Sequence, residues 1–280
     1  MRFAICNEVF AGWDFRRVVE HVAGLGYDGL EIAPFTLADQ VNGISPARRR
    51  ELRALAAERG LAITGLHWLL VKPAGLHVCH PDPAVRLRTV DYLRRLIDFC
   101  ADLGGMTLVF GSPDQRSIPA GISRESGWRW AAESFAACGP AARGRGVTLC
   151  LEALPANLTN LLNTNAEVIA MVREIGHEGI RMMLDVKSMC AESLPVPENI
   201  RACRGWFHHF HANDANLRGP GFGKVDFKPI LQALDEAGYQ GFVSVEVFDF
   251  APDPETIARE SLRYLRACRV AGGPSGPPRV

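Results

Sequence analysis

The 280-residue chain has the length and composition of one ordinary globular enzyme domain. Its 31 basic and 31 acidic residues cancel, which excludes the basic surface expected of a nucleic-acid-binding protein or of an electrostatic membrane anchor. Its eight cysteines form no CxxC pair, which favours reduced, buried thiols and a cytoplasmic protein over a disulfide framework. No signal peptide or membrane-spanning run is expected. The predicted partner is a small molecule, and a homo-oligomer is left open.

Short apolar runs alternate with amphipathic stretches along the chain. The apolar periodicity predicts eight strands, at Phe3 to Cys6, Gly29 to Ile32, Ala62 to His67, Thr107 to Phe110, Val147 to Glu152, Arg181 to Asp185, Trp206 to His211 and Phe242 to Glu246. It also predicts eight helices, at Phe15 to Leu25, Pro46 to Arg59, Ala84 to Leu103, Ser123 to Arg143, Ala166 to Ile175, Asn199 to Cys203, Phe227 to Ala237 and Pro254 to Ala267. Asp14 and Ser45 are predicted N-caps.

This alternation predicts an α/β fold, a (β/α)8 TIM barrel, for which about 250 residues are typical. Residues 1–270 are expected to form a single domain. The sequence AGGPSGPPRV, residues 271–280, is expected to be a disordered tail.

Four residues of metal-binding types stand at the ends of four successive predicted strands: Glu152, Asp185, His211 and Glu246. In a barrel, the carboxyl ends of the strands meet at one rim, so these side chains are expected to converge there. Three carboxylates and an imidazole suit one divalent cation such as Mn²⁺, Co²⁺ or Mg²⁺. His209 shares the orientation of His211 and is expected to support the ligands rather than to bind the ion.

The motifs around these residues resemble those of a known family. They are LEAL at Glu152, LNT from Leu162, LDVKSM at Asp185, HFHAND at His211, GPGFGKVDF from Gly219 and VEVF at Glu246. The chain from about Arg2 to Val270 resembles the sugar phosphate isomerases/epimerases, which are xylose-isomerase-like TIM barrels, and within them the ketose 3-epimerase branch.

This resemblance implies a mechanism. It assigns the cation to Glu152, Asp185, His211 and Glu246, and it assigns proton transfer to Glu152 and Glu246. The ion would chelate a substrate carbonyl and the adjacent hydroxyl and stabilise an enediolate. One glutamate would remove the carbon-bound proton from one face while the other returns it to the opposite face, which inverts the centre.

Three further residues are candidates for substrate contact. His67 ends the third predicted strand, although it could simply pack in the barrel. Lys187 shares the inward orientation of Asp185, although it could instead pair with Glu31. Arg218 lies in the glycine-rich loop after the seventh strand, where a surface role is the alternative.

The chain departs from the ketose 3-epimerase pattern at three positions. It has Leu158, Ser188 and Leu217 where that branch has a glutamate, a histidine and an arginine that hold substrate hydroxyls. An unpaired hydroxyl in such a pocket costs about 1 to 3 kcal/mol. Free ketohexoses are therefore expected to be poor substrates, and a less hydroxylated compound or a keto-glycoside is favoured.

The predicted activity is that of a metal-dependent isomerase or epimerase acting on a carbohydrate-like α-hydroxycarbonyl compound. One alternative is a metal-dependent lyase or dehydratase that acts on a keto sugar, keto-glycoside or keto-inositol. Relatives of endonuclease IV share the barrel, but they need more histidine ligands and a DNA-binding surface. A non-catalytic sugar-binding barrel would need no metal.

Overall fold

The computed structural model describes residues 1–270 and shows a closed barrel of eight parallel strands. The strands follow the chain order around the barrel, and the last one pairs with the first. They are β1 Arg2–Cys6, β2 Gly29–Ile32, β3 Ala62–Leu66, β4 Thr107–Phe110, β5 Thr148–Leu151, β6 Ile180–Asp185, β7 Phe207–Ala212 and β8 Phe242–Val245. The predicted TIM barrel and its eight strands are confirmed. The predicted tail, residues 271–280, lies outside the described residues.

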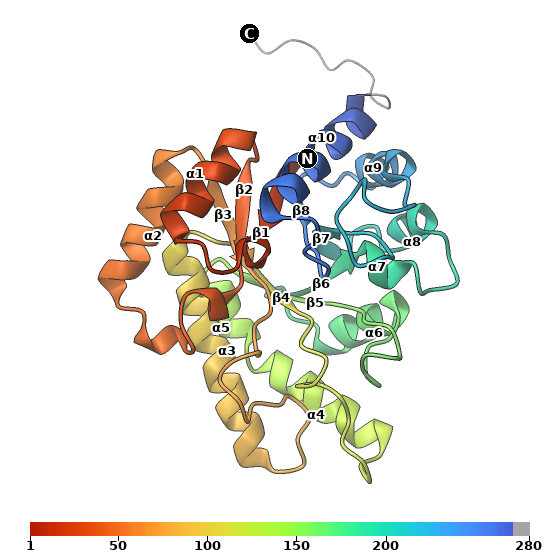
Figure 1. Cartoon of the computed structure of the whole chain (residues 1–280). Helices are drawn as coiled ribbons and strands as arrows, with labels where there is room; N and C mark the ends of the chain where they lie inside the picture. Colours follow the sequence, from red (N-terminus) through yellow and green to blue (C-terminus); the bar gives the residue numbers. More distant parts are fainter. Residues whose placement is uncertain (271–280) are drawn as a thin grey trace.

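Helices surround the strands, as Figure 1 shows. They are α1 Phe15–Leu25, α2 Pro46–Glu58, α3 Pro83–Leu103, α4 Arg124–Ala136, α5 Gly139–Gly144, α6 Asn165–Ile175, α7 Val186–Met189, α8 Val196–Ala202, α9 Phe227–Glu236 and α10 Pro254–Val270, with short 3-10 turns at Asn7–Phe10, Pro34–Thr36 and Val41–Gly43. Asp14 and Ser45 cap α1 and α2 as predicted, accepting from the backbone N–H groups of Arg16 and Arg48. No described helix is both long enough and apolar enough to span a bilayer.

The predicted helices need correction at two places. The single helix predicted from Ser123 to Arg143 is divided, because α4 ends at Ala136 and α5 begins at Gly139. Pro140 lies in the first turn of α5, where its missing N–H costs nothing, whereas it would break a continuous helix. The short helix α7 was not predicted at all. It begins directly after β6, where the Asp185 carboxylate accepts from the N–H of Ser188 and caps it.

Side chains alternate between the helix-facing core and the barrel interior. The main apolar core lies between strands and helices, while Val109, Cys150 and Met183 form a separate small cluster. Val109 pairs with Cys150 in the sheet, and Met183 pairs with His209, so these residues form one interior layer. Since side chains two residues apart on a strand share a face, the next interior layer lies at the carboxyl ends of the strands.

Candidate active site

The predicted ligands occupy that next layer. Glu152, Asp185 and His211 each lie two residues beyond a member of the interior layer, and Glu246 lies one residue beyond the end of β8. The strand order places Asp185 and His211 between the two glutamates along the rim. All four side chains are buried. The positions of these four residues at the rim therefore agree with the arrangement expected from the sequence.

Three of the four predicted ligands lie within reach of one ion. One potential ligand atom each from Asp185, His211 and Glu246 lies within 4.8 Å of the other two. His211 Nδ1 is 3.1 Å from Glu246 Oε2. Asn213 joins the group, because its Nδ2 donates to Asp185 Oδ2 at 2.5 Å and to Glu246 Oε2 at 3.5 Å. Its Oδ1 accepts from the backbone N–H of Lys187 at 2.7 Å, which fixes the orientation of the amide.

Glu152 is held at the edge of this group by the loop after β4. A Cβ built on Gly111 would lie 2.5 Å from Glu152 Oε2, so a larger residue at this position would displace the carboxylate. The fully buried Arg116 donates from Nη1 to the backbone carbonyl of Glu152 at 2.6 Å. These contacts come from residues far away in the sequence, and no local pattern predicts them.

The electrostatics of the group favour a bound cation. Burial, followed by the negative charges of Asp185 and Glu246, raises the pKa of Glu152 to about 8. Burial also acts to raise the pKa of Glu246, but the adjacent His211 outweighs it and lowers that pKa. Crowded carboxylates of this kind need a positive charge among them. The donors present, three carboxylates and an imidazole, fit one hard divalent cation.

Glu31 is a central residue of this group, and the sequence analysis did not identify it as functional. Its Oε1 lies 3.0 Å from His211 Nε2, and its Oε2 lies 2.8 Å from His209 Nε2. Burial works against ionisation of Glu31, but the two imidazoles lower its pKa well below the usual value. Glu31 therefore accepts from Nε2 of His211, so Nδ1, which faces Glu246 Oε2 at 3.1 Å, is the nitrogen that would bind an ion. A carboxylate that orients a metal-binding histidine in this way raises its basicity. His209 is a supporting residue, as expected.

His67 belongs to a second buried pair. Its Nε2 lies 2.6 Å from Glu8 Oε2, and its Nδ1 has no hydrogen-bond partner among the described residues. Burial acts to lower the pKa of His67, but the charge of Glu8 and the hydrogen bond to it raise that pKa overall. A histidine held in this state can donate to a substrate oxygen. The sequence indicated His67 but gave no sign of Glu8 as its partner.

Two of the other triads of metal-binding residue types in the described chain are less suited to an ion. Cys6, Glu31 and His67 lie close together, but burial and nearby carboxylates raise the pKa of the Cys6 thiol well above its usual value. A protonated thiol is a poor ligand. In the triad of Glu31, His209 and His211, Glu31 is already engaged by both rings.

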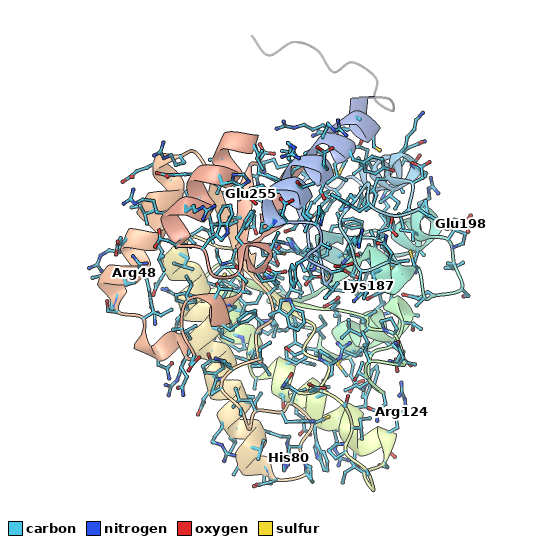
Figure 2. The ribbon with its side chains drawn as sticks, in the orientation of Figure 1. Arg48, His80, Arg124, Lys187, Glu198 and Glu255 are labelled. Atoms are coloured by element: carbon cyan, nitrogen blue, oxygen red, sulfur yellow. The ribbon has the colours of Figure 1, made fainter. Side chains whose placement is uncertain are left out.

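A cavity of about 570 Å³ opens beside this group, and Glu152, Glu246, His67 and Lys187 are among its lining residues. Figure 2 shows Lys187 nearer the middle of the molecule than Arg48, His80 or Glu198. Lys187 Nζ lies 3.7 Å from the centroid of the Phe248 ring. The structure gives no contact between Lys187 and Glu31, whose oxygens are bonded to histidines instead.

Arg218 is not brought to the cavity. Its Nε donates to Asp249 Oδ2 at 2.8 Å, and both side chains are partly exposed. The structure therefore gives no support to the predicted substrate contact of Arg218. Of the three departures from the epimerase pattern, Leu158 and Leu217 line the cavity, whereas Ser188 is buried in α7 and is not a lining residue.

Strained backbone is concentrated around the cavity. Among the described residues, four that are not glycine have positive φ, and three of them line the cavity: Trp68 at 52°, Ser112 at 38° and Leu217 at 72°. A left-handed conformation costs a side chain with a Cβ about 1 to 2 kcal/mol. Such strain persists where the surrounding structure fixes the conformation of the residue, and it is common at binding sites.

Comparison with known protein families identifies the family of this chain. The model of the xylose isomerase-like TIM barrel family matches residues 19–268. The chain therefore belongs to this family.

Several relatives of known name match most of the chain. It is 30% identical to the D-psicose 3-epimerase of Ruminiclostridium cellulolyticum over 244 residues, which cover 84% of this chain and 78% of that protein. It is 23% identical to the 3-dehydro-D-guloside 4-epimerase of Escherichia coli, over 96% of this chain and 100% of that protein. A solved structure of D-psicose 3-epimerase with D-tagatose from Clostridium cellulolyticum has a TM-score of 0.84 at 25% identity, covering 96% of this chain and 99% of the other.

Proposed function

We propose that this protein is a divalent-metal-dependent sugar epimerase or isomerase that acts on a carbohydrate-like α-hydroxycarbonyl compound. The observation that carries the proposal is the rim arrangement. Two buried glutamates, Glu152 and Glu246, line one cavity, with Asp185 and His211 between them along the rim. The sugar epimerases similar to this chain over most of its length support the same reaction class.

Glu152, Asp185, His211 and Glu246 would hold the ion, with Mn²⁺ the first candidate and Co²⁺ or Mg²⁺ the others. When bound, the cation would neutralise the negative charge that develops on the substrate oxygens as the neighbouring carbon loses its proton. The supporting residues fit this role: Asn213 orients two carboxylates, and Glu31 orients His211.

Proton transfer falls to the two glutamates. They project from strands three positions apart around the barrel, so a substrate lying between them meets a carboxylate on either side. One takes the proton and the other supplies one to the opposite face, which inverts the carbon. His67, with its free Nδ1, and Lys187 line the same cavity and can hold substrate oxygens.

The proposal can be tested by exchange of the carbon-bound proton in D₂O. We expect wild-type protein supplied with Mn²⁺ to exchange this proton and epimerise a keto sugar drawn from a broad panel. Glu152→Gln and Glu246→Gln should each abolish epimerisation, while one of them can retain exchange on a single face. The exposed Glu198→Gln is the control, and metal content is measured in every variant. Full epimerisation by either mutant at saturating metal would contradict the two-carboxylate mechanism.

Elimination is the second candidate reaction, and one observation favours it. Proton removal beside a ketone can be followed by loss of a substituent instead of reprotonation, and the cavity has an apolar wall that would accommodate such a leaving group. Product analysis separates the two. An epimer of unchanged mass indicates epimerisation, whereas an unsaturated sugar and a released fragment indicate a lyase.

A further inference from the structure

Part of the cavity wall is apolar. Beyond the glutamates, its lining includes Trp68, Leu154, Leu158, Leu217 and Phe248. They come from the loops after β3, β5, β7 and β8, so four separate segments place hydrophobic side chains around one space. A site for a free polyol would need donors and acceptors at these positions, because each sugar hydroxyl removed from water requires a partner.

Two of these leucines are partly exposed at the cavity. Leu158 and Leu217 are 42% and 45% exposed, although both line the cavity. Leu217 also keeps a leucine side chain at a φ of 72°, where glycine or asparagine would be tolerated better. The backbone carbonyl of Leu217 accepts from the N–H groups of Phe248 and Asp249, at 2.8 and 2.9 Å, which holds the two loops together.

An aromatic pair completes the wall. The rings of Trp68 and Phe248 meet edge to face, with centroids 6.0 Å apart and planes at 62°. Trp68 Nε1 is buried and has no hydrogen-bond partner within residues 1–270. Lys187 Nζ lies over the Phe248 ring. A planar apolar group bearing an oxygen would meet aromatic rings and the Lys187 ammonium group here.

We infer that the substrate is a keto-glycoside, a sugar that carries the carbonyl and its adjacent hydroxyl and also bears an aryl substituent that contacts this apolar wall. The inference rests on the proposed function, because the ion and the two glutamates would act on the sugar part. A volume of about 570 Å³ lies within the range of about 300 to 1,000 Å³ typical of sites for drug-sized ligands, so it accommodates a sugar together with an aromatic ring.

Binding of unreactive analogues tests this inference directly. Phenyl β-D-glucoside and methyl β-D-glucoside differ only in the aglycone, and neither has a carbonyl, so neither can be turned over. Isothermal titration of the Mn²⁺-supplemented protein should give a Kd at least 10-fold lower for the phenyl compound. Equal dissociation constants, or binding of neither compound, would overturn the inference.

Three variants locate the binding surface. Leu158→Asn and Leu217→Asn should each reduce the preference for phenyl over methyl about 3-fold or more. Both leucines are partly exposed, and asparagine is well suited to the positive φ of residue 217, so folding is not at risk. Leu194→Asn is the matched control, because Leu194 is 46% exposed and is not a lining residue. A preference that is unchanged in both cavity variants would place the aryl group elsewhere and overturn the inference.

Turnover separates the inference from the proposed function. The 3-keto derivatives of the same two glucosides, together with D-fructose, are incubated in D₂O, and proton exchange, epimer and released phenol are followed. We expect kcat/KM to be highest for the phenyl keto-glucoside. If the phenyl glucoside binds more tightly but no compound exchanges a proton, the proposed function fails while the aryl site stands. If D-fructose exchanges with the highest kcat/KM, the reaction class stands and the inference fails.

Discussion

The ends of the strands and the loops that follow them differ in chemistry, although both face the same cavity. At the strand ends, carboxylates and imidazoles are buried and joined by hydrogen bonds, as in the contact of Glu31 with His211. In the loops, Leu158 and Leu217 are partly exposed and face open space. The strand ends are rigid and carry what we propose is the reaction, whereas the loops can change which substrate reaches it.

Removal of one ligand at the strand ends should have the largest effect. Asp185→Asn keeps the cap of α7, because asparagine is also a good N-cap, but it removes a negative charge from the ion site. We expect loss of bound metal and a fall in kcat/KM of about 1,000-fold or more, checked by elemental analysis and exchange assays. A stoichiometric ion that survives both Asp185→Ala and His211→Ala would show that the site lies elsewhere.

The pH dependence of metal binding should show the effect of Glu152. Its pKa is raised from 4.5 to about 8, so in the metal-free protein it carries a proton at pH 7 that the ion must displace. Protonation of Glu152 should weaken the metal affinity about 50-fold between pH 8 and pH 6, and about tenfold for each further pH unit. Metal titrations at several pH values can measure this, and the slope should decrease by about one in Glu152→Gln.

The raised pKa of Glu152 also makes the stability of the metal-free protein depend on pH. Because the folded-state pKa of Glu152 lies above its ordinary value, the contribution of Glu152 to the free energy of unfolding of the metal-free protein should decrease as pH rises from 4.5 to about 8. Urea unfolding of the wild type and Glu152→Gln checks it. An identical pH profile for the two proteins would contradict the assigned pKa.

The supporting residues should have a smaller, graded effect. Glu31→Gln weakens the acceptor for two histidines, one of which is a predicted ligand, and should reduce metal affinity about 10- to 100-fold. Glu8→Gln is a matched control, because Glu8 is also buried and bonded to a histidine, but His67 is not among the predicted ligands. Similar losses of metal affinity in the two variants would show general destabilisation rather than loss of orientation at His211.

Changes in the loops should alter the substrate and leave the metal site intact. Leu158→Glu together with Leu217→Arg supplies polar groups at the cavity wall, and we expect kcat/KM for D-fructose to rise about tenfold. Adding Ser188→His should give no further gain, because Ser188 is buried in α7. Leu194→Arg is the control for added surface charge. Wild-type activity on D-fructose as high as on any other keto sugar would refute the argument about the three departures.

The barrel could be predicted from the sequence because the alternation of apolar runs and amphipathic stretches is a local signal. The candidate ligands could be predicted because strand ends meet at one rim, whichever helices intervene. The pairings of Glu31 with His209 and of Glu8 with His67 could not be predicted, because they join strands and loops far apart in the sequence. Arg218 was assigned to the cavity without knowledge of Asp249, which lies 31 residues further on and binds it.

The hydrogen bonds from Phe248 and Asp249 to the Leu217 carbonyl make two loops one structural unit. A change in the backbone of either loop therefore affects the other, and the shape of the entrance can change without any change at a ligand-bearing residue. For protein engineering, this separates two tasks. The loops after β7 and β8 are best diversified together as a cassette, while the strand ends are kept fixed.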